Sequence, residues 1–352
     1  MRAWMVRSGK AGEREQWALS EGYTGGGFGD IEDLTDANTR ELVVAALTRA
    51  LPASKDGAIR TFANQLWALR GVMSKGDLVV MPLKTGPELA IGRVLGEYRY
   101  LDAPDLQRRH VRPVEWIVTD LPRTAVRQDL LHTLGAFSTI CEVSRNDGAR
   151  RVEGLLKTRR DPGVKVAPVS KPGKSKTGSA TAAVEDDDPV AEIEIEQYAR
   201  DKIQARVGEV FTGHGLTTLV AAILRAKGFT CDVAPPGPDG GIDILAGTGP
   251  LGLDAPRLVV SVKSETTQVG RPVVQQLHGA VSGQKADQGL LVAWGGVTRP
   301  AREELNANRF VLKLWNADDV LAGLFRHYEE MSASIQAEIP LKQVWTLVEE
   351  SG

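Results

Sequence analysis

The fold of this chain is decided by two nearby stretches, Gly237-Pro238-Asp239-Gly240-Gly241-Ile242-Asp243 and Arg257-Leu258-Val259-Val260-Ser261-Val262-Lys263. The paired glycines at 240 and 241 permit a tight turn with positive φ, so Asp243 can enter a strand directly from the turn. In the second stretch Val259, Ser261 and Lys263 share one face, because side chains alternate along a strand. We therefore expect Lys263 to lie on the face that meets Asp243.

The segments on either side predict alternating strands and helices. Apolar residues recur at helical spacing from Leu216 to Leu224, and Gly228 ends that helix. Gly247-Thr248-Gly249-Pro250 is typical of a hairpin between the two central strands. Further strands are expected at 229–233, 289–293 and 310–315, with helices at 273–281 and 300–306. This order predicts a mixed sheet flanked by helices, an α/β or α+β domain.

Together these motifs resemble the Mrr-type restriction endonuclease domain of the PD-(D/E)xK superfamily. The resemblance rests on Lys227-Gly228-Phe229, the turn at 238–243, the Val262-Lys263 strand, and Gly289-Leu290-Leu291-Val292 with Gly295-Gly296 and Ala301 beyond it. It covers roughly residues 208–330. It implies that Asp243 binds Mg²⁺ or Mn²⁺ and that Lys263 orients or activates the water that attacks a phosphodiester.

One position departs from that pattern. Ser261 stands where the family usually has Gln or Glu, and a hydroxyl is a poorer metal ligand than a carboxylate. Glu265, on the same face if the strand continues, or Gln276 (or Gln275) on the next helix could supply the missing oxygen. The alternative is a fold that only binds, in which Asp243 caps the turn. His214 and His278 are expected to be surface or capping residues.

Composition sets the outer limits. A chain of 352 residues, 42% hydrophobic and 25% charged, is long enough for two domains with separate cores. The formal net charge of −2 means that any nucleic-acid binding must use local basic faces. Cys141 and Cys231 lie too far apart to indicate a disulfide framework or a zinc site. There is neither an apolar run of membrane length nor a signal-peptide pattern, so we expect a cytoplasmic protein.

The chain divides at a stretch that lacks hydrophobic periodicity. Residues 157–190 are rich in Lys, Pro, Gly, Ser, Thr and Ala, which predicts a flexible linker. Its basic first half would either hold phosphates loosely or act as a plain tether. The predicted domains are therefore 1–156 and 191–352, the second beginning with a helix at 191–207.

The N-terminal domain reads as a small curved sheet or barrel with helices packed outside. Strands are expected at 4–7, 77–84, 88–100 and 110–116, and helices at 17–19, 39–50 and 56–69. This domain resembles the EVE branch of the PUA-like superfamily. The resemblance rests on Trp4, the helix with Asn64 and Trp67, and the strands Lys75-Gly76-Asp77-Leu78-Val79-Val80 and Ile91-Gly92-Arg93-Val94. That resemblance implies a pocket for a flipped, modified base.

A pocket of this kind needs aromatic faces for stacking and polar groups for the base edge. The aromatic candidates are Phe28, Trp67, Tyr98 and Trp116, although Trp67 and Trp116 also suit a core. Asp30 and Asn64 are candidate edge readers. Phe28 stands out because a large aromatic between loop glycines has little reason to be there for packing. Candidate phosphate contacts are Arg7, Lys84, Arg93 and Arg123.

The sequence thus favours a modification-dependent, type IV-like restriction endonuclease. Its partner would be double-stranded DNA that carries a modification, read at the N-terminus and cut at the C-terminus. Cutting both strands would call for a homodimer. The alternative is a non-catalytic reader with a degenerate nuclease domain. The pocket could also read RNA, or a backbone modification such as phosphorothioate.

Overall fold

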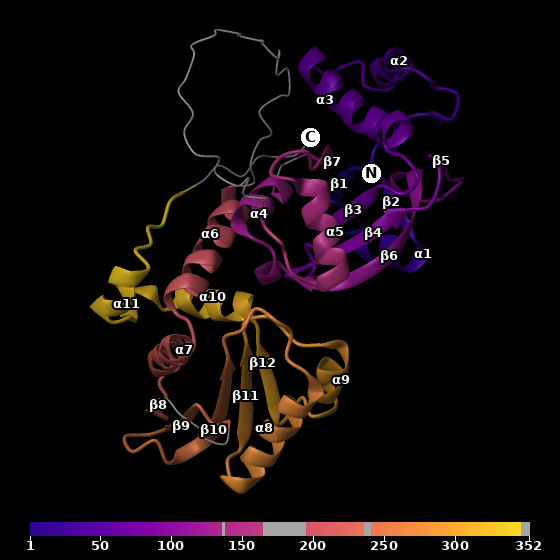
Figure 1. The fold of residues 1–352 in the computed structure, drawn as a ribbon. Coiled ribbons are helices and arrows are strands. Elements are labelled where there is room, and N and C mark those ends of the chain that lie inside the picture. Colours follow the sequence, from indigo (N-terminus) through magenta and orange to yellow (C-terminus); the bar gives the residue numbers. More distant parts are fainter. Residues whose placement is uncertain (136–137, 165–194, 236–240, 346–352) are drawn as a thin grey trace, which may run out of the picture. The chain divides into compact units, whose positions relative to one another are not determined.

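The computed structural model describes residues 1–135, 138–164, 195–235 and 241–345. The chain forms two compact units, Met1–Tyr198 and Ala199–Gly352. Both combine a sheet with helices (Figure 1).

The N-terminal unit is built on a curled sheet with the order β2-β6-β4-β3-β1-β7, to which β5 adds by pairing with β6. Only β1 and β3 run parallel; the other pairs are antiparallel. The long strand β6 pairs with β2, β4 and β5, and this confirms the expected curved sheet. The strands are β1 (Ala3–Val6), β2 (Tyr23–Gly25), β3 (Leu78–Pro82), β4 (Glu88–Val94), β5 (Arg99–Tyr100), β6 (His110–Pro122) and β7 (Ile140–Glu142).

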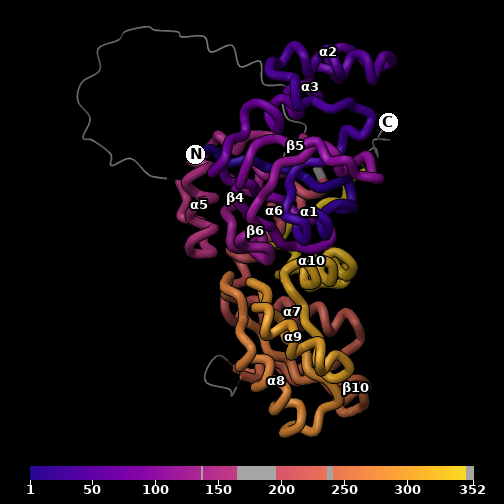
Figure 2. Tube along the Cα trace, turned by 90° about the vertical axis from the view of Figure 1, so that its right-hand side faces the viewer, coloured from indigo at the N-terminus to yellow at the C-terminus, as the bar shows by residue number. Residues whose placement is uncertain are grey.

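Helices cover both faces of this sheet. Alternate residues of β1 belong to two separate apolar clusters, Trp4 and Val6 to one and Ala3 and Met5 to the other. Helices α2 and α3 lie side by side at one end of the unit in both views (Figure 1 and Figure 2). The helical segments are α1 (Glu15–Glu21), α2 (Arg40–Ala50), α3 (Asp56–Trp67), a π-helix (Ala68–Val72), 3₁₀ turns (Leu106–Arg108 and Arg123–Ala125), α4 (Gln128–Leu134) and α5 (Gly148–Thr158).

The N-terminal unit extends past residue 157, where the linker was expected to begin. Asp161 is buried and pairs with the fully buried Arg151 of α5, with 2.6 Å between Nη2 and Oδ2. Arg159 pairs with Asp120 of β6 at 2.8 Å. Hydrophobic periodicity does not reveal that this segment belongs to the N-terminal unit, because a buried ion pair rather than apolar burial holds it there. The rest of the expected linker, residues 165–190, lies outside the described residues.

The C-terminal unit confirms the expected mixed sheet, in the order β12-β11-β10-β9-β8. Strands β8, β9 and β10 pair antiparallel, and β10, β11 and β12 pair parallel. The β9–β10 ladder has a register shift between Asp254 and Leu258. The strands are β8 (Thr230–Val233), β9 (Ile244–Thr248), β10 (Asp254–Lys263), β11 (Gln288–Ala293) and β12 (Leu312–Trp315).

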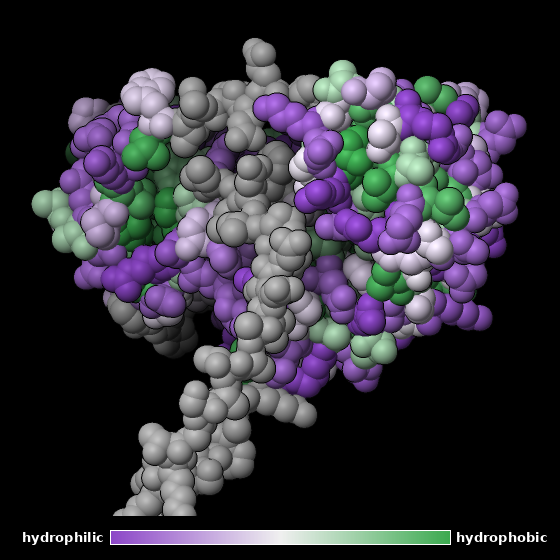
Figure 3. All heavy atoms as spheres, turned by 90° about the horizontal axis from the view of Figure 1, so that it is seen from above, coloured by the Kyte–Doolittle hydropathy of each residue, from purple (hydrophilic) through white to green (hydrophobic). Residues whose placement is uncertain are grey.

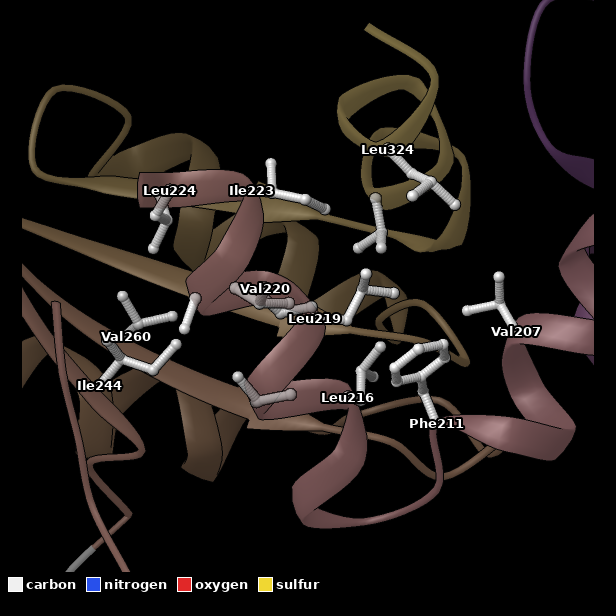
Figure 4. Close-up of a cluster of buried hydrophobic side chains, with 14 of the residues drawn as sticks. Val207, Phe211, Leu216, Leu219, Val220, Ile223, Leu224, Ile244, Val260 and Leu324 are labelled. Atoms are coloured by element: carbon white, nitrogen blue, oxygen red, sulfur yellow. The ribbon is translucent and has the colours of Figure 1, made fainter. Parts of the chain in front are cut away.

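Helix α7 supplies much of the core on one face of this sheet. Its residues Leu216, Leu219, Val220, Ile223 and Leu224 point into a cluster that includes Ile244 and Val260 (Figure 4). Helices α8 and α9 pack on the other face. The helical segments are α6 (Ile195–Val210), α7 (His214–Ala226), α8 (Arg271–Gly283), α9 (Arg299–Ala307), α10 (Ala317–Arg326), a 3₁₀ turn (Tyr328–Glu330) and α11 (Ala333–Glu338); the last three continue beyond the elements that we expected.

The described surface is mixed in polarity. On the face drawn in Figure 3, hydrophilic residues predominate and hydrophobic areas are smaller. Across the ranges that the structure describes, no single helix is long and apolar enough to cross a membrane.

Candidate functional site

Asp243 is held by the backbone of β10. Its N–H donates to the carbonyl oxygen of Val260 at 2.9 Å, and its carboxylate Oδ2 accepts the N–H of Val262 at 2.8 Å. The carboxylate therefore takes the place of the next backbone acceptor just before β9 begins. Gly241 has φ +85°, which confirms the expected positive-φ glycine at this position. The Gly237–Gly240 part of the turn lies outside the described residues.

The alternation expected for β10 is confirmed. Val260 and Val262 belong to the core beneath α7, whereas Val259 packs on the opposite face with α8. Ser261 and Lys263 share the face of Val259 because side chains alternate. Val260 pairs with Ile244, so continuing this antiparallel register by one residue sets Ser261 opposite Asp243. The two strands thus bring Asp243, Ser261 and Lys263 to one end of the sheet.

These residues differ in exposure. Ser261 is buried, at 2% exposure, in the centre of the sheet beside β11. Lys263 is half-buried at the end of β10, and its carbonyl oxygen accepts the N–H of Trp294 at 2.9 Å. The lysine side chain can therefore reach solvent, whereas the serine hydroxyl is enclosed.

Gln276 comes close to this end of the sheet, whereas Glu265 is exposed beyond the end of β10. Gln276 lies on α8 with its amide against Gly241, because a Cβ atom added to Gly241 would lie 2.7 Å from Gln276 Nε2. Any side chain at 241 would collide with that amide. Gln276 therefore lies beside Gly241, two residues before Asp243, whereas Glu265 is exposed.

The N-terminus of α7 lies beside the same strand end. The N–H of Gly213 donates to Ser264 Oγ at 3.1 Å, directly after Lys263. His214, the first residue of α7, is exposed there, as expected for a surface residue, and Thr217 of the same helix is buried at 2% exposure. Sequence reasoning did not find the Gly213–Ser264 contact, because nothing in the pattern pairs a loop glycine with a distant serine.

The carboxylate of Asp243 is an oxygen donor of the kind that Mg²⁺ prefers. Within the described ranges no group of three or more His, Cys, Asp or Glu residues could hold a metal. Asp243 would supply one carboxylate, and the side-chain amide of Gln276 lies against Gly241, two residues before it. Mg²⁺ commonly binds through one or two carboxylates together with substrate phosphates. The residues present therefore fit such an ion if the phosphates complete its coordination.

The candidate base-pocket residues of the N-terminal unit occupy different environments. Phe28 is half-buried in the left-handed region, at φ 58°, with its ring edge-on to Phe62 at 6.0 Å between centroids. Asp30 is exposed two residues further on. Asn64 is exposed on α3, and its Oδ1 accepts two N–H groups of Arg40, at 2.8 and 2.9 Å. Phe28 and Asp30 share one loop, and Asn64 is already engaged.

All four aromatic candidates, Phe28 included, belong to or pack against one apolar cluster of this unit. The ring of Trp67 packs on Gly71, where an added Cβ would lie 2.4 Å from a ring carbon. Trp116 is half-buried, and its Nε1 donates to the carbonyl oxygen of Ala18 at 2.8 Å. Tyr98 is a core residue at 8% exposure. The two tryptophans therefore match the expected alternative of core packing, and Tyr98 presents no open face for a base.

Tyr98 instead helps to hold the Phe28 loop. Its hydroxyl lies 2.8 Å from Nδ1 of the buried His110, whose Nε2 lies 3.1 Å from the carbonyl oxygen of Ile31. Burial raises the pKa of Tyr98 and lowers the pKa of His110. Both side chains are therefore neutral near pH 7, with His110 Nε2–H donating to Ile31 and the Tyr98 hydroxyl donating to His110.

The four candidate phosphate contacts are spread over the N-terminal unit. Arg123 is buried at 7% exposure, which argues against a surface contact in this conformation. Arg7 donates to the carbonyl oxygen of Gly135 at 3.4 Å. Lys84 is half-buried, and its backbone N–H donates to Glu15. Arg93 donates to the carbonyl oxygen of Gly76 at 2.8 Å and lines an open pocket of about 370 Å³ with Arg2 and Lys75.

Two parts of the chain match known families. Residues 209–324 match the Mrr catalytic family, described as restriction endonuclease, and residues 4–138 match a domain of unknown function, DUF8426. The type IV methyl-directed restriction enzyme EcoKMrr of Escherichia coli (strain K12) is 40% identical over 65 residues. That match covers 18% of this chain and 21% of the relative's length.

Solved structures show more distant likenesses. The DNA modification-dependent restriction endonuclease AspBHI is 19% identical, with a TM-score of 0.31 over 74% of this chain and 67% of its own. The restriction endonuclease MspJI in complex with a 27-mer oligonucleotide is 14% identical, with a TM-score of 0.31 over 96% and 79%. A protein of unknown function, AF1548, is 14% identical, with a TM-score of 0.25 over 31% and 65%.

Proposed function

We propose that this chain, whose residues 209–324 match the Mrr restriction endonuclease family, is a modification-dependent DNA endonuclease. The observation that carries the proposal is the fixed carboxylate of Asp243, bonded to the backbone of the strand that bears Lys263. An acid and a lysine at one strand end are suited to phosphodiester hydrolysis. The similarity to EcoKMrr, a methyl-directed restriction enzyme, supports modified DNA as the substrate.

The chemistry assigns a part to each side chain. Hydrolysis of a phosphodiester builds negative charge on the nonbridging oxygens and on the leaving oxygen. Mg²⁺ or Mn²⁺ held by Asp243 and phosphate oxygens would stabilise that charge. Lys263 places a compact positive charge beside the phosphate, where it orients the attacking water. Gln276 positions the Gly241 segment next to Asp243.

The N-terminal unit is proposed to select the DNA. Phe28 and Asp30 share a glycine-rich loop and remain the best candidates for stacking on a modified base and reading its edge. Base flipping would bring the base to them. Cleavage of both strands needs two nuclease centres, so we propose that the enzyme acts as a homodimer on double-stranded DNA.

The test is cleavage by the full chain of duplexes that are unmodified, carry 5-methylcytosine or carry N6-methyladenine, with Mg²⁺ or Mn²⁺. We expect cutting of a modified duplex and not of the unmodified one. Asp243→Asn should reduce the rate about 100- to 1,000-fold. The amide oxygen of Asn can still accept the N–H of Val262, so this change removes charge with little effect on the strand.

Matched controls separate catalysis from stability. Asp232→Asn changes an exposed carboxylate of the neighbouring strand β8, and Lys313→Ala is the control for Lys263→Ala because Lys313 is an exposed lysine on β12. Both control variants should cut modified DNA at the rate of the wild-type enzyme. Equal rates for Asp243→Asn, Lys263→Ala and their controls would overturn the proposed site.

A second candidate function is a reader of modified nucleic acid that does not cut. The buried Ser261 favours it, since a serine hydroxyl stands opposite Asp243 where the family usually has Gln or Glu. Under this reading the chain binds a modified duplex, a phosphorothioate duplex or RNA selectively and cuts none of them with either metal. Asp243→Asn would then leave binding unchanged, whereas any metal-dependent cutting lost in that variant excludes the reader-only function.

A further inference from the structure

The loop that carries Phe28 has an unusual backbone. Gly25, Gly26, Gly27 and Phe28 all have positive φ, at 102°, 80°, 80° and 58°. The N–H of Gly26 donates to the carbonyl oxygen of His110, and that of Gly27 to the carbonyl oxygen of Gln107, both at 2.7 Å. A left-handed aromatic residue persists only when its surroundings enforce it. The backbone of the Gly25–Phe28 loop is therefore held in one conformation, and we call this loop the platform.

Arg14 lies on this platform. A Cβ atom added to Gly26 would lie 2.8 Å from Arg14 Nε, and one added to Gly27 would lie 3.6 Å from Arg14 Nη2. The absence of side chains at these two positions is what lets the guanidinium approach the backbone so closely. Arg14 and the loop thus form one surface made of a cation and bare peptide groups.

Arg14 lacks a bonded counterion. In the part of the chain that the structure describes, its Nε is inaccessible to solvent and has no hydrogen-bond acceptor. Burial lowers the pKa of Arg14, the charge of Arg108 lowers it further, and the carboxylates of Glu13 and Asp105 act in the opposite direction. Neither carboxylate makes an ion pair with Arg14. An enclosed guanidinium N–H without an acceptor is unfavourable and requires an explanation.

The two fully buried arginines of this unit show the contrast. Arg112 donates to the carbonyl oxygens of Leu69, Arg70 and Gly96 at 2.5, 3.0 and 3.0 Å. Arg151 is bonded to Asp129 and Asp161. Both are structural cations with filled acceptors. Arg14 differs from these two because no acceptor among the described residues binds its guanidinium, and because it is only half-buried, so its terminal N–H groups can still donate to a ligand.

A second guanidinium lies near the first. Arg108 stacks over the ring of Trp17 at 5.4 Å, and Trp17 in turn stacks on Tyr23 at 5.8 Å between ring centroids. The Nε of Arg108 lies 2.8 Å from Asp105 Oδ2 but lacks the geometry of a hydrogen bond. The stack holds Arg108 in place while leaving it able to donate. Two such cations beside a bare loop suit an anion that accepts several hydrogen bonds.

We propose that Arg14 and Arg108 bind one phosphate group at the Gly25–Phe28 loop, and that its source is the backbone of the bound nucleic acid. The source rests on the proposed function; the phosphate chemistry does not. Guanidinium groups match the geometry of phosphate oxygens, and phosphate contacts fix the register of a strand against a reading site. The phosphate would place the neighbouring nucleotide beside Phe28.

The test measures binding of unmodified, 5-methylcytosine and N6-methyladenine duplexes to the full chain across a range of salt concentrations. Arg14→Gln should weaken binding about tenfold and reduce the steepness of log K against log salt by about 0.9, the value for one lost phosphate contact. Arg14→Lys keeps the charge and should retain the slope while losing part of the affinity. Arg60→Gln, at an exposed arginine of α3, removes one charge elsewhere and should leave the slope unchanged.

Two further measurements complete the test. The melting temperature of Arg14→Gln without ligand should equal or exceed that of the wild-type chain, because a half-buried guanidinium whose Nε has no acceptor among the described residues is removed. A large fall would show a structural residue and overturn the proposal. If the chain binds no nucleic acid, the proposed function fails. The phosphate site is then tested by the effect of inorganic phosphate on the melting temperature. Phosphate that raises the melting temperature of the unmodified chain but not of Arg14→Gln supports it. No dependence on Arg14 with either DNA or phosphate overturns it.

Discussion

The candidate site of the C-terminal unit is built on two neighbouring strands, whereas the candidate pocket of the N-terminal unit draws on a loop, helices and a sheet. In the strands, alternation and register set where Asp243, Ser261 and Lys263 lie. In the N-terminal unit, tertiary contacts decide whether an aromatic ring faces solvent or the core. The difference shows that sequence predicts the faces and register of neighbouring strands well, and predicts poorly which loop or helix residues are exposed.

The largest effect is expected where the N-terminal unit depends on a buried ion pair. Arg151→Met removes the partner of Asp161, which is as buried as the arginine itself. Leaving one charge buried alone should lower the free energy of unfolding by about 3–5 kcal/mol. Calorimetry should show the transition of the N-terminal unit moving down and that of the C-terminal unit unmoved. Arg150→Met, at a more exposed arginine of the same helix, is the control, and equal shifts in both transitions would break the comparison of two separate units.

A smaller effect is expected in the strand site. Ser261→Gln introduces the family's usual residue at a position with 2% exposure. Overfilling this packed site should lower the unfolding free energy by about 1–3 kcal/mol. Denaturant titration measures it against Ser282→Gln, an exposed serine of α8. An unchanged stability would mean that the space opposite Asp243 already fits the longer side chain, and would sharpen the case for catalysis.

The smallest expected effect is the pH dependence of the stability of the N-terminal unit, which arises from His110 beside the Phe28 loop. Burial lowers the pKa of His110 below the value of about 6.5 in an unfolded chain. Between these two values the unfolded chain binds more protons, so stability is full above pH 6.5 and falls as the pH drops. Each unit of lowering contributes about 1.4 kcal/mol. The melting temperature of the N-terminal unit should therefore fall from pH 7 to pH 5, less so in His110→Gln, whereas His278→Gln should keep the wild-type slope.

Much of the C-terminal fold could be predicted from the sequence because apolar alternation and glycine punctuation mark its elements directly. The positive φ of Gly241 and the two faces of β10 were expected and are confirmed. The extension to α10 and α11 was not expected. The proximity of Gln276 to Gly241 was only one of several options, because a helix residue's neighbours depend on how the helix packs.

The N-terminal unit was harder for identifiable reasons. Tyr98 and Arg123 are residue types common at binding surfaces, yet both are buried here. The sequence does not predict a binding role for Arg14, because nothing in its local sequence distinguishes it from any other arginine. Only the folded loop reveals that its Nε has no acceptor. Properties that arise from contacts distant in sequence, such as burial and hydrogen-bond satisfaction, cannot be read from a local pattern.

The register shift between Asp254 and Leu258 bears on how this domain can vary. The hairpin tip lies at the far end of β9 and β10 from Asp243 and Lys263, and the irregularity separates the tip from the paired residues. Insertions or deletions at 249–253 would be taken up there, leaving the pairing of Val260 with Ile244 intact. The length of this hairpin could therefore differ among relatives. By contrast, inserting or deleting one residue within Val259–Lys263 would turn Lys263 to the opposite face of the sheet.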